Sequence, residues 1–205
     1  MAEISFIDQS FDVLYMTDDP VAAIARAART CYRSEANASA ENDRRLVRGL
    51  IRRGHEAMVE HANMAVRFVT DRSVTHELVR HRLFSFAQES QRYVNSNNDG
   101  FKFILPVGID GSEDATIRMA CRDSAHAYAS MVERGARPEI ARAVLPNATA
   151  TQIVVSGNMR EWRHCLKLRC DSHAHPQIRA LMTSLLEWLK RDERTAILFE
   201  DIGAE

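Results

Sequence analysis

The feature that most restricts the fold is an unbroken apolar stripe near the end of the chain. Within residues 176–190, large apolar side chains recur at intervals of three and four positions, at Ile178, Leu181, Met182, Leu185, Leu186 and Leu189. This period predicts a helix with one fully apolar face. The stripe therefore belongs to the core or to a subunit interface, and by itself it implies no chemistry.

Helix-like and strand-like segments alternate along the rest of the chain. Helices are predicted over residues 22–29, 41–53, 71–80, 112–133, 138–144 and 158–168, and strands over residues 11–16, 63–69, 92–94, 101–105 and 150–155. The fold class is therefore α/β (α+β), a small sheet flanked by long helices. No repeat or linker interrupts the chain, and the loop-like segments 95–100 and 107–114 are short, so residues 1–205 are expected to form a single domain.

Local signals mark several element ends. Asp19 before Pro20 predicts the start of a helix, since Asp caps helices and Pro favours the first helical position. Gly54 and Gly135 each follow a periodic segment and are placed to end it.

Composition excludes several classes of protein. No apolar run approaches the ~20 residues that a membrane span needs. The first residues lack the basic and apolar regions of a secretory signal, so the cytoplasm is the expected location. The four cysteines are too scattered for a disulfide framework and are expected to be reduced, mostly as small buried apolar residues.

The charge pattern points to a small anionic ligand. A net charge of −1 argues against a protein that coats nucleic acid. Basic residues nevertheless gather in two stretches, Arg72, Arg80, Arg82 and Arg92 in the first, and Arg160, Arg163, Lys167 and Arg169 in the second. The chain has no G-x-G-x-x-G, no phosphate loop and no G-x-S-x-G, so any anion must be held by side chains.

The segment RHRLFSFAQESQRY, residues 80–93, carries the most specific pattern. It predicts a helix that ends in Arg80-His81-Arg82, followed by a turn that delivers Ser90 and Arg92 to the start of a strand. The alternative is a solvated helix end, where arginines favour the negative end of the helix dipole. Ser90 and Arg92 at fixed offsets favour a binding site.

This segment resembles the signature of the flavin-dependent thymidylate synthases, R-H-R followed by seven residues and Ser. The longer family form is also met at Ser85 and Arg92. Ala87 and Gln88 stand where the family often has Asn-Glu, so Gln88 and the following Glu89 both remain candidates for the acidic partner. Glu77 occupies a position that the family fills with Gln or Glu.

Further blocks resemble the family in the same order. ARTCYRS (28–34) and GHEAMVEH (54–61) come first, the second with Ala57 where a small hydroxyl residue is usual. ARAVLP (141–146) matches the block that supplies a nucleotide-binding arginine, here Arg142. GNMREWRHCLKLRCDSHAH (157–175) is similar to the block that holds flavin and substrate, through Asn158, Arg160, His164 and Arg169.

Helix geometry agrees with the last assignment. Arg160 and His164 are four positions apart and share one helix face, whereas Arg169 lies about 140° further round. One helix can therefore face two ligands, or the sites of two subunits. The alternative is a surface helix with scattered arginines.

The resemblance implies an activity, the reductive methylation of dUMP to dTMP, with methylenetetrahydrofolate as carbon donor, FAD as hydride carrier and NADPH as reductant. It implies that FAD is bound by Arg80, His81, Arg82, Gln88, Asn158, Arg160 and His164. It implies that dUMP is bound by Glu77, Arg80, Gln88, Ser90, Gln91, Arg92, Arg142 and Arg169. The implied catalytic residues are Arg169, which would hydrogen-bond the uracil ring, and Ser90. A homotetramer with shared sites is expected.

The histidines and cysteines near the end of the chain also allow a metal-site interpretation. His164, Cys165, Cys170, His173 and His175 lack the paired spacing of a zinc site, so no metal is expected. His173 is expected to support the turn after Arg169.

Nucleophilic catalysis is also disfavoured. The pattern favours a packing role for Cys165 and Cys170 over a role as nucleophile. Ser90 has no adjacent base, so it is expected to bind and activate the substrate.

His55 has two open roles, lining the flavin or folate side or pairing with Glu56 or Glu60.

The rival from another class is a non-catalytic nucleotide- or RNA-binding module that uses the arginines as a phosphate patch. Against it, the aromatic content is only 7%, and no aromatic-basic interleaving marks a stacking platform. No nucleic acid and no membrane partner are expected.

Overall fold

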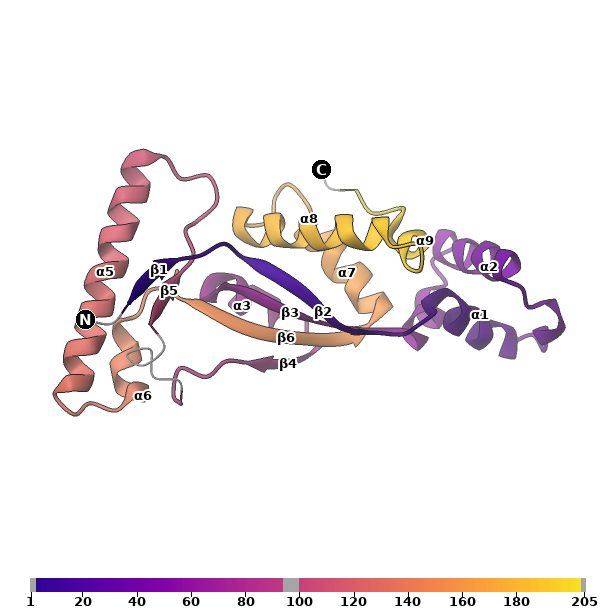
Figure 1. The fold of residues 1–205 in the computed structure, drawn as a ribbon. Helices are drawn as coiled ribbons and strands as arrows, with labels where there is room; N and C mark the ends of the chain where they lie inside the picture. The colour runs from indigo at the N-terminus through magenta and orange to yellow at the C-terminus, as the bar shows by residue number, and fades with distance from the viewer. Residues whose placement is uncertain (1–2, 94–99, 204–205) are drawn as a thin grey trace. The chain divides into compact units, whose positions relative to one another are not determined.

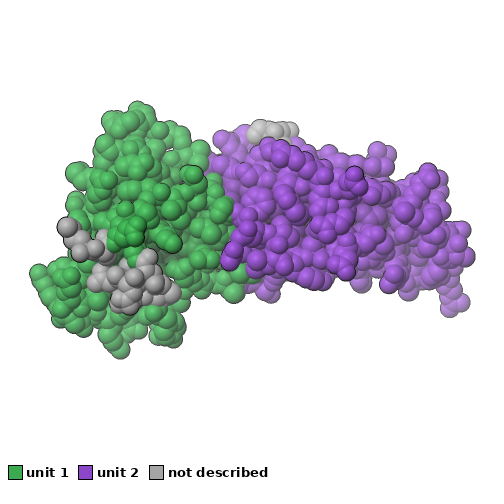
Figure 2. Space-filling model, in the orientation of Figure 1, with its two compact units in different colours: residues 1–10, 68–80, 87–154 green, residues 11–67, 81–86, 155–205 purple. Residues whose placement is uncertain are grey.

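The computed structural model describes residues 3–93 and 100–203 and confirms the α+β class. The chain divides into two compact units, green and purple in Figure 2. Unit 1 comprises residues 1–10, 68–80 and 87–154, and unit 2 comprises residues 11–67, 81–86 and 155–205. The single domain over residues 1–205 stays a prediction.

Unit 1 is built around one long helix. Strands β1 (Ile4–Phe6) and β5 (Phe101–Phe103) pair in parallel, and α5 (Gly111–Glu133) supplies most of the residues that pack with them. The core is a cluster of buried side chains at Phe101, Phe103, Cys121, Ala125, Tyr128 and Ala141. Asp110 begins α5 with a capping box shared with Glu113, and Gly135 follows its end with φ at 92°.

The shorter helices of unit 1 differ in detail from the sequence prediction. Helix α3 (Arg72–Leu78) begins where Asp71 accepts a hydrogen bond from the Val74 amide at 2.9 Å, as predicted, but it ends two residues before position 80. The predicted helix over residues 138–144 is α6 (Pro138–Ala141) followed by a 3₁₀ turn, η3 (Arg142–Val144).

A four-stranded sheet has the order β2-β3-β6-β4 (Figure 1). Its strands are β2 (Ser10–Met16), β3 (Asn63–Asp71), β4 (Ser85–Gln88) and β6 (Ala150–Asn158). The predicted strands over residues 11–16, 63–69, 101–105 and 150–155 are confirmed.

The predicted strand over residues 92–94 is wrong. Arg92 and Tyr93 lie in a turn, closed by a hydrogen bond from the Tyr93 amide to the Ser90 carbonyl at 3.1 Å, and Val94 lies outside the described residues. The strand nearest to this turn is β4, which ends at Gln88, five residues before Tyr93. Its four residues are too few to show a clear alternation in sequence.

Unit 2 holds the remaining helices. They are α1 (Pro20–Thr30), α2 (Ala40–Arg52), α7 (Met159–Arg169), α8 (Pro176–Arg191) and α9 (Ala196–Phe199), with 3₁₀ turns η1 (Glu35–Asn37) and η2 (Glu56–His61). The predicted start of α1 is confirmed, because the Asp19 carboxylate accepts a hydrogen bond from Ala22 at 2.9 Å. Gly54 follows α2 with φ at 70°, a conformation that glycine adopts without strain.

The apolar stripe of α8 is core. Each of its six side chains is at most 2% exposed within the single chain, and α8 packs on α7 and α9 (Figure 1). The alternative of a subunit interface is therefore wrong, because unit 2 covers the stripe itself.

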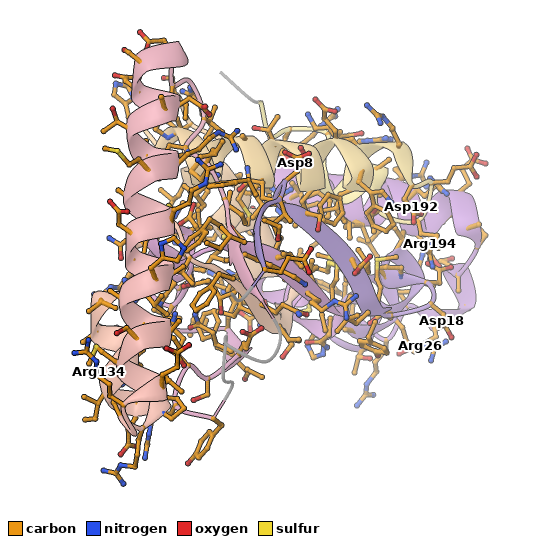
Figure 3. The ribbon with its side chains drawn as sticks, turned by 60° about the vertical axis from the view of Figure 1, so that its left-hand side comes forward. Asp8, Asp18, Arg26, Arg134, Asp192 and Arg194 are labelled. Atoms are coloured by element: carbon orange, nitrogen blue, oxygen red, sulfur yellow. The ribbon has the colours of Figure 1, made fainter. Side chains whose placement is uncertain are left out.

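A charged pair holds the loop that follows α8. Arg194 donates hydrogen bonds to both carboxylate oxygens of Asp192, at distances from 2.6 to 3.2 Å, and Figure 3 shows the two side chains close together. The buried Thr195 hydroxyl donates to the Leu189 carbonyl at 2.6 Å. The chain can therefore turn sharply from α8 into α9.

The four cysteines are free thiols. Cys121, Cys165 and Cys170 are buried, as the sequence predicted, whereas Cys31 is exposed. No helix in residues 3–93 and 100–203 is both long and apolar enough to span a bilayer.

Candidate active site

The R-H-R motif lies in a turn and not at a helix end. Helix α3 stops at Leu78, the Arg80 amide donates to the Glu77 carbonyl at 3.2 Å, and the Phe84 amide donates to the His81 carbonyl at 3.1 Å. The turn directs neighbouring side chains differently, so that His81 is 6% exposed while Arg80 and Arg82 are exposed. The prediction that the helix ends in all three residues is thus corrected.

Helix α7 brings three polar side chains of unit 2 to His81. Asn158 caps the helix by accepting a hydrogen bond from the Glu161 amide at 2.9 Å. At the other end of α7, Arg169 Nε donates to His81 Nε2 at 3.0 Å. The Glu161 carboxylate lies 3.6 Å from His81 Nδ1, and the His164 ring centroid lies 6.0 Å from that of His81.

The predicted 140° separation does not keep Arg169 and His164 apart. Both side chains reach the same imidazole, because the long Arg169 side chain extends across the helix surface. Arg160, by contrast, is held by Glu60 at 2.6 Å, on a different part of unit 2.

Burial and charge keep His81 neutral. Burial first, and then the neighbouring Arg169 and His164, lower the pKa of His81 to about 4. Burial raises the pKa of Glu161, against a smaller opposite effect of His164 and Arg160. The cluster therefore combines a neutral imidazole, a buried carboxyl and a guanidinium.

Aromatic side chains pack beside this cluster. Phe84 lies against Trp162, with ring centroids 4.5 Å apart, and the buried Trp162 indole donates to the Met64 carbonyl at 3.1 Å. A Cβ on Gly157 would lie only 2.4 Å from the Phe84 ring. Glycine at position 157 thus leaves room for the ring of Phe84, two residues after the R-H-R motif.

A separate pocket of about 380 Å³ also lies in unit 2. Its wall combines apolar side chains with His55 and Arg160, and it is lined by Ala28, Cys31, Tyr32, Leu50, Gly54, His55, Glu56, Ala57, Met58 and Arg160. Two of the family-like blocks, residues 28–34 and 54–61, therefore meet at one cavity. The structure places His55 on this pocket, and its role there stays a prediction.

Two basic residues of the second arginine stretch have structural partners. Arg163 is fully buried and donates to Asp201 at 2.7 and 2.8 Å and to Glu56 at 3.1 Å, and Lys167 lies 3.7 Å from the same two carboxylates. Arg163 also donates to the Leu198 carbonyl. These contacts correct the inference that the whole stretch serves an anionic ligand.

Most of the predicted nucleotide residues lie in unit 1. The Ser90 hydroxyl accepts a hydrogen bond from the Arg92 amide at 3.3 Å, and the Arg92 side chain lies 3.7 Å from Glu139. Gln88 Nε2 donates to the Thr75 hydroxyl at 3.0 Å. The exposed Arg92 guanidinium remains accessible to a phosphate.

Arg72 belongs to the first arginine stretch but is not among the predicted FAD- or dUMP-binding residues. Its Nη1 atom is buried without a hydrogen-bond partner among the described residues, as is Gln91 Nε2. Burial first, and then the nearby Arg142, lower the pKa of Arg72, while Glu89 opposes them. Two guanidinium groups this close, one of them with an unpaired buried N–H, are suited to an anion. The sequence signal for Arg72 was its place in the arginine-rich stretch.

The structure thus separates the predicted residues into two groups. Unit 1 holds Glu77, Arg80, Gln88, Ser90, Gln91, Arg92 and Arg142, and unit 2 holds His81, Arg82, Asn158, Arg160, His164 and Arg169. Direct contacts join His81 to Arg169 and to His164, and Ser90 to Arg92. The roles assigned to these residues stay predictions.

The metal and cysteine alternatives find no support in the described residues. No group of three His, Cys, Asp or Glu in that part of the chain could hold a metal ion, and His173 instead contacts Asp171 at 2.9 Å. Burial raises the pKa of the Cys165 and Cys170 thiols, which disfavours a thiolate nucleophile. Both cysteines therefore act in packing.

Comparison with known proteins gives a consistent result. Residues 12–192 match the family described as thymidylate synthase complementing protein. A flavin-dependent thymidylate synthase of Geobacter sulfurreducens is 37% identical over 200 residues, which cover 93% of this chain and 85% of that protein. One of Mycolicibacterium gilvum is 38% identical over 201 residues, covering 87% and 79%.

The fold has a solved counterpart. The crystal structure of a UMP/dUMP methylase, PolB from Streptomyces cacaoi bound with 5-Br dUMP, superposes with a TM-score of 0.78 at 24% identity, over 99% of both chains. At that identity the likeness establishes the fold alone. With the family match over most of the chain and relatives above 35% identity, this protein belongs to the flavin-dependent thymidylate synthase family.

Proposed function

We propose that this protein methylates dUMP reductively to dTMP, with methylenetetrahydrofolate as the carbon donor, FAD as the hydride carrier and NADPH as the reductant. The observation that carries the proposal is the family match over residues 12–192, within which Arg80, His81, Arg82 and Ser90 stand at the signature positions. The rival of a non-catalytic nucleotide-binding module is not favoured by that match.

Most of the proposed FAD-binding residues belong to unit 2. The pocket beside α1 and η2 offers apolar side chains for a flat ring system and the cation Arg160 for a phosphate. Arg80, His81, Arg82, Gln88, Asn158 and His164 complete the proposed FAD-binding set. Bound there, the flavin would supply hydride transfer, and the protein would supply position and polarity.

Most of the proposed dUMP-binding residues belong to unit 1, and Arg169 belongs to unit 2. Arg92 and Arg142 bind the phosphate of dUMP. Further dUMP-binding residues are Glu77, Arg80, Gln88 and Gln91. The Ser90 hydroxyl binds and activates the substrate. The Arg169 guanidinium hydrogen-bonds the uracil ring and stabilises the negative charge that develops when hydride arrives.

A spectrum and a tritium assay test this proposal. The purified protein should be yellow or take up FAD, and NADPH should bleach the flavin absorbance. Tritium should leave ring-labelled dUMP only when NADPH and methylenetetrahydrofolate are both present. Colourless protein that FAD cannot reconstitute, combined with salt-dependent binding of oligonucleotides, would support the nucleotide-binding module instead.

A further inference from the structure

His81 is held between two charged side chains of α7. On one side Arg169 Nε lies 3.0 Å from His81 Nε2, and on the other the Glu161 carboxylate lies 3.6 Å from His81 Nδ1. His81 is 6% exposed and Glu161 is 5% exposed, so water competes little for either contact. Both α7 residues and His81 belong to unit 2.

The hydrogen bond from Arg169 is compatible with only one tautomer of neutral His81. A guanidinium N–H can only donate, so His81 Nε2 must be the unprotonated nitrogen that accepts from Arg169. The proton of the neutral ring is then on Nδ1, which faces the Glu161 carboxylate. A carboxylate beside Nδ1 favours this tautomer, as carboxylates do for histidines whose other nitrogen is engaged.

The other groups around His81 act in the same direction. His164 faces the ring from α7 with a centroid distance of 6.0 Å, and Phe84 faces it from its own segment at 6.2 Å. A second positive charge on His81 would meet Arg169 and His164 in a buried position, so the neutral ring is favoured. The imidazole therefore remains an acceptor for Arg169 at neutral pH.

We propose that Glu161 is a positioning residue, which acts through the Nδ1–H tautomer of His81 to hold the Arg169 guanidinium in one orientation. The inference rests on the proposed function, in which Arg169 polarises the uracil ring. A guanidinium whose Nε is already fixed presents its two terminal nitrogens in a defined plane, and this geometry suits the in-plane oxygens and nitrogen of a pyrimidine.

Three substitutions separate this role from a merely structural one. Glu161→Leu removes the carboxylate that faces Nδ1, and Glu161→Gln keeps an oxygen of similar shape there. Glu187→Gln changes an exposed carboxylate of α8 and is the matched control. Nitrogen-15 NMR of labelled histidine in the unliganded protein reads the tautomer of His81, which His81→Asn assigns. Thermal melting confirms that each variant is folded.

The expected results are specific. The wild type and Glu161→Gln should show the Nδ1–H tautomer, whereas Glu161→Leu should show a mixture. In Glu161→Leu, kcat for NADPH-dependent tritium release should fall roughly 10- to 100-fold, because misplacing a positioned group by about 1 Å can cost a rate factor of that order. The KM for dUMP and the flavin content should change less than threefold, and Glu161→Gln should recover most of the rate.

Two results would overturn the proposal. One is an Nε2–H tautomer in the wild type, and the other is an unchanged tautomer and kcat in a folded Glu161→Leu protein. Failure of the proposed function looks different, since a wild type without flavin or turnover can still display the Nδ1–H tautomer. In that case the tautomer in Glu161→Leu still decides whether Glu161 governs His81.

Discussion

At the scale of single residues, the R-H-R motif shows how a turn gives adjacent side chains different environments. Arg80 and Arg82 are exposed to water, whereas His81 is buried and neutral. The motif therefore places two cations at the surface and one imidazole inside, and the imidazole accepts a hydrogen bond from Arg169.

Replacement of Ser90 by Ala should weaken catalysis without abolishing it. The hydroxyl contacts the Arg92 amide, and no described contact joins it to a base, so we expect it to bind and activate the substrate. The loss of one such hydrogen bond should lower kcat/KM by roughly tenfold. Tritium release measures the rate and calorimetry the affinity for dUMP. Complete loss of turnover with dUMP affinity intact would instead indicate covalent catalysis by Ser90.

The depressed pKa of His81 predicts a pH dependence of stability. The folded protein holds His81 with a pKa of about 4, below the ordinary value of 6.5, so protonation favours unfolding. The stability from the neutral ring is present above pH 6.5 and is lost as the pH falls towards 4, by roughly 3 kcal/mol at most.

Urea unfolding at a series of pH values measures this loss. His81→Gln should remove that part of the pH dependence, while a substitution of the exposed His173 to Gln should leave it unchanged. Parallel pH profiles for the wild type and His81→Gln would contradict a depressed pKa.

At the scale of elements, side chains distant in sequence decide how the strands and helices fit together. Phe84, just before β4, occupies the space left open at Gly157 of β6. Arg163 of α7 joins η2 to the segment after α9 through Glu56 and Asp201. Both contacts lie beside predicted flavin residues in the sequence, since Gly157 precedes Asn158 and Arg163 precedes His164.

Gly157→Ala should destabilise unit 2 and displace the aromatic ring beside the R-H-R motif. The new methyl group would lie 2.4 Å from Phe84, which packs against the buried Trp162 and has little room to move. Overpacking of this kind costs about 1–3 kcal/mol. Chemical denaturation measures it against Gly111→Ala, where nothing lies within 4 Å of the added carbon. Equal stability of the two variants would contradict the close packing.

Arg163→Met should destabilise the protein by roughly 3 kcal/mol, because Glu56 and Asp201 would lose the buried guanidinium that pairs with them. The matched control is Arg191→Met, whose partner Glu187 is largely exposed and whose loss should cost less than about 1 kcal/mol. The difference in unfolding free energy between the two variants is the measurement. Similar values for both would show that the Arg163 network contributes little.

At the scale of the whole molecule, the apolar stripe of α8 no longer argues for assembly, since unit 2 buries it. We propose a homotetramer with shared sites from the family alone. Sedimentation velocity of the FAD-loaded protein should give a single species about four times the mass of the 23.2 kDa chain. A monomer at micromolar concentration would contradict the proposed assembly.

The sequence alone determined the family and most of the element positions. The ordered blocks from residue 28 to residue 175 indicated the family. Local periods and caps indicated the element positions, as at Asp19, Gly54 and the long helix from Gly111 to Glu133. Such signals depend on residues a few positions apart, so they survive without knowledge of the tertiary contacts.

Only the tertiary structure decided the environment of each functional side chain. It turned His81 inward to Arg169 and Glu161, placed Arg72 near Arg142, paired Arg163 with carboxylates and assigned the α8 stripe to the core. It also replaced the predicted strand over residues 92–94 by β4. Burial, charge pairing and tautomer depend on groups brought together from distant parts of the chain, and no local pattern records those distances.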